Sequence, residues 1–198
     1  MKSKKINKLF FLILTILLIN TELFASPKEF ISKLTADASK VLASNETKDE
    51  KMLKLINLAK DNVDINGIGM YTLGKYRKSL SENQIKEYKT LFRKYFLKSF
   101  SSRLSEYTDP KINVLSEEII NKKYTIVSSV LEASDKRPEI KIDWRVYTIN
   151  PEKLLVRDLI IEGLSLARTQ REEFNSVIQN GDGNIEVLFS NLREFITN

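Results

Sequence analysis

Residues 154–178 restrict the fold of this chain most, because they predict a buried strand that passes directly into an amphipathic helix. Residues 154–161 are apolar except for Arg157 and Asp158, and their leucine and β-branched content favours a strand. After a Glu-Gly pair, Ser165 is positioned to cap a helix whose apolar residues recur at helical spacing. A strand this apolar, followed at once by such a helix, belongs at the centre of a core.

After residue 110 the apolar period changes to two, which predicts β-strands. Four strands are expected, over residues 111–120, 123–132, 139–149 and 153–162. The short connections between them imply an antiparallel meander. In the third strand Trp144 and its apolar neighbours alternate with charged residues, so one face of the sheet is predicted to lie against helices.

Helical periodicity predicts five further helices, over residues 27–44, 48–62, 65–73, 81–107 and 185–196. Ser81 and Gln84 have the spacing of a capping box. The helix over residues 81–107 carries an aromatic stripe, and its basic residues lie largely on another face, which favours a core helix over a nucleic-acid surface. The predicted fold is α+β, a four-stranded twisted antiparallel sheet packed against a helical subdomain.

The first 25 residues have the features of a secretory signal peptide: four lysines, an apolar run over residues 9–19 and a small residue, Ala25, at the expected cleavage site. Eleven helical residues span roughly 16 Å, well short of the roughly 30 Å hydrocarbon layer of a membrane. Cleavage is therefore favoured over an uncleaved anchor. It leaves 28 of the 32 basic and 25 of the 26 acidic residues, a net charge of +3, which weakens a nucleic-acid interpretation.

The chain contains neither cysteine nor histidine, which excludes disulfides and removes the usual general base and zinc ligand. The segment around Ser165 lacks the final glycine of a nucleophile elbow, so Ser165 is interpreted as a helix N-cap. Residues 180–184 resemble the start of a calcium loop but lack its glutamate, and are interpreted as a turn. Asp158 is expected to pair with an arginine, namely Arg145, Arg168 or Arg171. No catalytic residue and no metal site are predicted.

The run DLIIEGLSLARTQREEF at residues 158–174 resembles the signature of the MlaC family. Two further blocks occur in the family's order, LGKY at residues 73–76 leading into SENQI at residues 81–85, and DWRV at residues 143–146. Together the resemblance covers roughly residues 50–196.

MlaC proteins are periplasmic carriers of phospholipid between the two membranes of Gram-negative bacteria. The resemblance implies a signal peptide (1–25) and an MlaC-like phospholipid-binding domain (26–198), divided into helices (26–107), a sheet (111–162) and C-terminal helices (165–196). It implies an apolar cavity for acyl chains, no cofactor other than phospholipid as cargo, and no covalent chemistry. The implied partners are an inner-membrane ABC transporter bearing an MCE-domain protein and an outer-membrane lipoprotein–porin complex, and no nucleic acid.

A cavity of this kind could form if the helix over residues 81–107 loosely covers the Trp144 face of the sheet, and the resemblance is carried onto this chain with that arrangement in view. The predicted lipid-binding residues are Leu73, Tyr76, Phe92, Tyr95, Phe96, Phe100, Ile126, Trp144, Val146, Leu159, Ile161, Leu164, Leu166 and Phe174. Two alternatives stay open. One is a periplasmic adaptor or chaperone without a lipid cavity, and the other is a small enzyme that uses Asp143 or Asp158 as a buried general base.

Overall fold

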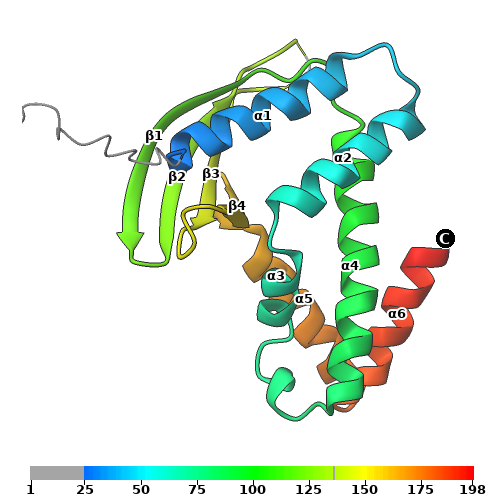
Figure 1. Cartoon of the computed structure of the whole chain (residues 1–198). Coiled ribbons are helices and arrows are strands. Elements are labelled where there is room, and N and C mark those ends of the chain that lie inside the picture. The colour runs from blue at the N-terminus through cyan, green and yellow to red at the C-terminus, as the bar shows by residue number, and fades with distance from the viewer. Residues whose placement is uncertain (1–24, 136) are drawn as a thin grey trace, which may run out of the picture.

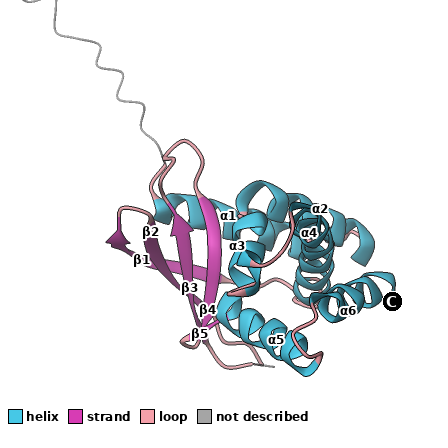
Figure 2. Cartoon of the chain, turned by 90° about the horizontal axis from the view of Figure 1, so that it is seen from below, coloured by secondary structure: helices cyan, strands magenta, loops and turns pink. Residues whose placement is uncertain are grey.

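The structure, a computed structural model, describes residues 25–135 and 137–198, so the predicted signal peptide lies outside the described residues except for Ala25. The helices in that range are α1 (Pro27–Ala43), α2 (Lys48–Asn62), α3 (Ile65–Thr72), the 3-10 turn η1 (Tyr76–Lys78), α4 (Glu82–Leu104), α5 (Leu166–Asn180) and α6 (Ile185–Thr197). The strands are β1 (Ile112–Asn121), β2 (Tyr124–Leu131), β3 (Ile140–Tyr147), β4 (Leu155–Ile161) and β5 (Leu164–Ser165). A sheet and a group of helices stand side by side (Figures 1 and 2).

The sheet is an antiparallel meander in the order β1-β2-β3-β4-β5, which confirms the predicted topology. The predicted strand count was one too low, because β5 is only two residues long and leaves no periodic signal. The turn before it consists of Glu162 and Gly163, both at positive φ (50° and 81°). Two such residues are typical of a tight hairpin turn, in which glycine tolerates the left-handed backbone.

Register places Val127, Trp144 and Leu159 opposite one another on one face, which we call the Trp144 face. A bulge in β4 follows, because Asp158 pairs with Arg145 while Val156 pairs with the next residue of β3. Arg157 is therefore the extra residue between two register positions.

Helix α1 lies across the sheet (Figure 1), and α1, rather than the predicted helix α4, packs against the Trp144 face. Ile31 of α1 is fully buried in a cluster with three valines of the sheet, and Phe30, Leu34 and Trp144 pack against that cluster. We call this set the sheet cluster. Helix α4 packs instead against α2, α3 and α6. The expectation failed because an apolar stripe shows that a helix has a buried face but does not show which element it packs against.

The helices α2 to α6 enclose a second cluster, the helical cluster, around the buried rings of Tyr88, Phe92 and Phe189. The capping box of Ser81 and Gln84 is confirmed, and two more are formed at the starts of α1 and α2. The basic residues of α4 are exposed as predicted, at Lys86, Lys89, Arg93 and Lys94. Within residues 25–135 and 137–198, no helix has both the length and the hydrophobicity that a transmembrane span requires.

Candidate functional site

The two hydrophobic clusters meet along β4. Val63, at the end of α2, packs against both clusters and forms a parallel bridge with Val156. The amide of Asp64 donates to the carbonyl of Val156 at 3.0 Å. The helical subdomain is therefore attached to the edge of the sheet at the point where α3 begins.

An arginine holds this junction from the sheet side. Arg157 Nε donates to Asp64 Oδ2 at 2.6 Å, and Arg157 Nη1 donates to the hydroxyl of Tyr124 at 3.0 Å. The guanidinium also lies 4.1 Å from the ring centre of Tyr147. Burial alone would lower the pKa of Arg157, but the hydrogen bond and the negative charge of Asp64 outweigh it and raise that pKa. Asp64 also caps α3, accepting from the amide of Gly67 at 2.8 Å.

A second polar joint fixes α5 to the sheet. Ser165 caps α5 as predicted, and its hydroxyl donates to Asp158 Oδ2 at 2.6 Å. Asp158 Oδ1 accepts from the amide of Ala167 at 3.0 Å, and Arg145 Nη1 lies 3.5 Å from Oδ2. Of the three predicted arginine partners of Asp158, the structure selects Arg145.

The two aspartates considered as general bases differ in their surroundings. Both oxygens of Asp158 are occupied in holding the start of α5, which is a structural role. Asp143 Oδ2 lies 3.6 Å from Lys141 Nζ, and its buried Oδ1 has no hydrogen-bond partner in the described part of the chain. Neither carboxylate adjoins a described groove.

The predicted lipid-binding residues fall into separate groups rather than one wall. Half of them belong to the helical cluster: Leu73, Tyr76, Phe92, Tyr95, Phe96, Phe100 and Phe174. Three belong to the sheet cluster: Trp144, Val146 and Leu159. Ile161 is half-buried on the Trp144 face, while Leu164 and Leu166 are exposed. Ile126 lies on the opposite face of the sheet, because it alternates with Val127, which pairs with Trp144.

Several of these large apolar side chains are only partly buried. In α4, Phe96 and Phe100 stack with their ring centres 5.8 Å apart, and both stay half-buried. The Tyr95 hydroxyl donates to Gln170 Oε1 of α5 at 2.8 Å, and burial raises the pKa of that phenol. Leu166 precedes Gln170 by four residues and so lies on the same side of α5. The margin where α4 and α5 meet therefore carries apolar side chains that are not fully buried.

On the sheet side, Trp144 is also half-buried. Its indole Nε1 donates to Ser129 Oγ at 2.9 Å, so the ring can face an apolar ligand without leaving an unsatisfied donor. The sheet and the helices thus each present incompletely buried rings.

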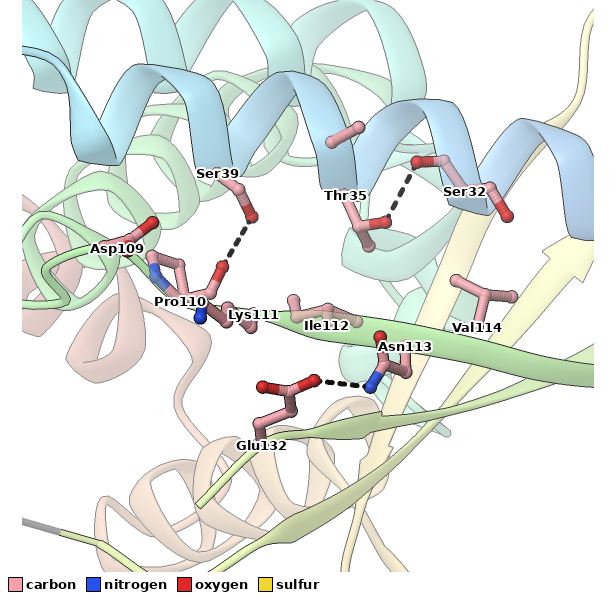
Figure 3. Close-up of a pocket in the computed structure, with 11 residues that line it drawn as sticks. Ser32, Thr35, Ser39, Asp109, Pro110, Lys111, Ile112, Asn113, Val114 and Glu132 are labelled. Atoms are coloured by element: carbon pink, nitrogen blue, oxygen red, sulfur yellow. Dashed lines mark hydrogen bonds between the residues drawn. The ribbon is translucent and has the colours of Figure 1, made fainter. Parts of the chain in front are cut away.

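Two grooves in the described residues have mixed polar and apolar linings and lie elsewhere. One, of about 480 Å³, runs between α1 and β1, where Ser39 donates to the carbonyl of Pro110 and Asn113 to Glu132 (Figure 3). The other, of about 410 Å³, adjoins it near Tyr107 and Arg137. Neither is lined by any predicted lipid-binding residue, so neither is the predicted apolar cavity. Within the described ranges, no group of acidic side chains is arranged to hold a metal ion.

Sequence reasoning missed both the helix that covers the sheet and the residues that join the two clusters. Phe30, Ile31 and Leu34 of α1 form one helix stripe, but nothing local paired that stripe with the sheet. The contact of Asp64 with Arg157 carried no signal either, since these residues lie 93 positions apart.

The fold is a small α+β domain with two apolar clusters. One helix covers its antiparallel sheet, and the β4 edge of that sheet joins the aromatic helical cluster. The model of a family described as MlaC protein matches residues 29–194, and the chain therefore belongs to the MlaC family. Among solved structures, a phospholipid-binding protein from Ralstonia solanacearum, in complex with a phospholipid, has a similar fold. The TM-score is 0.72 at 16% sequence identity, over 87% of this chain and 98% of that one. No curated protein sequence matches the chain.

Proposed function

We propose that this protein is a periplasmic carrier that binds a phospholipid by its acyl chains and moves it between the outer and inner membranes, as the substrate-binding component of the Mla system. Membership of the MlaC family supports transport rather than catalysis. The structural neighbour, which was solved with a phospholipid, supports phospholipid as the cargo. The observation that carries the proposal is the set of half-buried rings on both sides of the junction, Trp144 on the sheet and Tyr95, Phe96 and Phe100 on α4.

The energetics of the cargo set what the site must do. Two acyl chains contain about 30 methylenes, and at about 0.8 kcal/mol each their exposure to water costs roughly 24 kcal/mol. The tails must therefore be enclosed, whereas the head group can stay in water. Neither described groove is lined by the half-buried rings, so the proposal has the tails enter between the sheet cluster and the helical cluster, where those rings lie. The polar joints along β4 keep the subdomains attached while the clusters separate.

The proposal keeps the partners and location that the family resemblance implies. Residues 1–25 direct export and are then removed. The carrier exchanges lipid with an inner-membrane ABC transporter bearing an MCE-domain protein and with an outer-membrane lipoprotein–porin complex.

Trp144 is the sole tryptophan of the chain and provides a native probe of this site. Phospholipid brominated on its acyl chains is expected to quench Trp144 fluorescence, since bromine quenches an indole that it contacts. The matched control moves the probe to the other face of the sheet, in the double variant Trp144→Phe and Ile126→Trp. Equal quenching at positions 144 and 126 would contradict this placement of the tails.

Mass spectrometry of lipid extracted from the purified mature protein tests the cargo itself. The expected result is co-purified phospholipid. Repeated recovery of no lipid, together with no uptake from labelled vesicles, would refute the carrier function. It would leave the second candidate, a periplasmic adaptor or chaperone without a lipid cavity, for which the described grooves lack any of the predicted lipid-binding residues.

A further inference from the structure

A cationic surface lies where α3 and the turn that follows it adjoin the first turns of α5. Three of its cations follow α3 and two belong to α5. They are Lys75, Arg77, Lys78, Arg168 and Arg171, and all five residues are exposed. We call this surface the α3–α5 patch.

Contacts between α3 and α5 bring these residues together from distant parts of the chain. The guanidinium of Arg171 lies 5.2 Å from the ring centre of Tyr71 in α3. The same side chain lies against Gly74, where an added Cβ would come within 2.9 Å of Arg171 Nε. Arg168 precedes Arg171 by three residues and occupies the same side of α5. Arg171 therefore lies beside the turn that carries Lys75, Arg77 and Lys78.

The patch holds an excess of positive charge. In the described residues, Glu172 is the acidic partner of the patch, with Arg168 Nε 3.2 Å from its Oε1. No ion pair is formed in that range by Lys75, Arg77, Lys78 or Arg171. Five cations and one carboxylate give the patch a net charge of +4, compared with +3 for all of residues 26–198. A local excess of this size attracts an anionic surface.

We infer that the α3–α5 patch docks the protein on an anionic phospholipid membrane surface. Cations of this kind contribute to binding at a negatively charged leaflet, and the ring of Tyr71, 38% exposed beside Arg171, suits the boundary between head groups and acyl chains. The patch includes no residue of either described groove, so those grooves offer no cleft there for an extended acidic peptide. The inference rests on the proposed function, because a lipid carrier has a reason to approach the bilayer.

The test is co-sedimentation of the mature protein with vesicles of phosphatidylglycerol or of phosphatidylcholine at low salt. The patch variant carries Lys75→Gln, Arg77→Gln and Lys78→Gln. It spares Arg168, which pairs with Glu172, and Arg171, which packs on Tyr71 of α3, whereas Lys75 contacts the ring of its own neighbour Tyr76. Each cation near an anionic surface contributes about fivefold to partitioning, so the variant is expected to bind phosphatidylglycerol vesicles roughly 100-fold more weakly.

The matched control removes the same charge from exposed lysines of α4, with Lys86→Gln, Lys89→Gln and Lys94→Gln. The binding of this control variant to phosphatidylglycerol vesicles is expected to fall by less than about threefold. Phosphatidylcholine vesicles are expected to bind little of the wild-type protein or of either variant. Circular dichroism checks that both variants fold.

Failure of wild-type protein to bind phosphatidylglycerol vesicles overturns the inference, as does equal loss of binding in the patch and control variants. Retained binding of the patch variant also overturns it. Phospholipid content, measured by mass spectrometry in all three proteins, is expected to be unchanged. Absence of lipid from all three would count against the carrier function alone, since adsorption to vesicles is measured independently of cargo.

Discussion

Replacement of Asp158 by alanine tests the joint that fixes α5 to the sheet. The side chain of Asp158 is 1% exposed, and its two oxygens accept from the Ser165 hydroxyl and the Ala167 amide. Asp158→Ala leaves the buried Ala167 amide without a partner, at about 1–3 kcal/mol, and removes the bond to the half-buried hydroxyl, at about 1 kcal/mol. The pairing with Arg145 adds little, because the Arg145 side chain is 42% exposed.

The expected total is a loss of about 3 kcal/mol in the free energy of unfolding. For a chain of this size that corresponds to a fall of about 6–12 °C in Tm. Urea unfolding of lipid-free protein, followed by circular dichroism, measures the change from the midpoint at constant slope. Asp158→Asn, which keeps one oxygen for the Ala167 amide, is expected to cost less than Asp158→Ala.

A double-mutant cycle with Arg145→Gln separates the charge pair from the amide contact. The expected coupling between Arg145 and Asp158 is below about 1 kcal/mol. A cost below about 1 kcal/mol for Asp158→Ala would refute the reasoning. So would an equal cost for Arg145→Gln, because the ion pair would then dominate the joint.

Three further predictions concern the helical subdomain. Burial raises the pKa of Tyr88, whose hydroxyl bonds to Thr72; the stability that this shift confers is complete below about pH 10 and is lost as the pH rises above it. Tyr88→Phe should therefore lower the free energy of unfolding by about 1 kcal/mol at neutral pH. Between about pH 10 and 11.5, urea unfolding should show a smaller fall in stability for the variant than for the wild type, and an equal fall in both would contradict this. Ser81→Ala, which removes the N-cap of α4, should lower stability by about 1 kcal/mol in a thermal melt, whereas an unchanged Tm would argue against the cap. Gly74→Ala should cost about 1–2 kcal/mol, because φ is +55° and Arg171 fills the space; no loss in urea unfolding would show that neither constraint acts.

Much of the secondary structure could be predicted, because its signals are local. The bounds of α2 were predicted to the residue. The caps at Ser81 and Ser165 could be recognised because each serine accepts a hydrogen bond from the amide only three residues further along the chain. The meander followed from the short links between strands. The family resemblance likewise rests on contiguous blocks of sequence, and the family match confirms it.

The arrangement of the site could not be predicted in the same way, since it depends on which surfaces meet. Periodicity gave α1 and α4 similar apolar stripes, yet only the folded chain places α1 on the Trp144 face. Ile126 was assigned to the lipid-facing set, and strand register places it on the opposite face.

The two joints along β4 show the same limit most clearly. A one-residue bulge directs Arg157 toward Asp64 and leaves Asp158 facing the start of α5. Local patterns follow from contacts between near neighbours in the chain, so they can be read in order along it. Contacts such as Arg157 with Asp64 arise only when distant segments pack, and no local pattern encodes which segments those are.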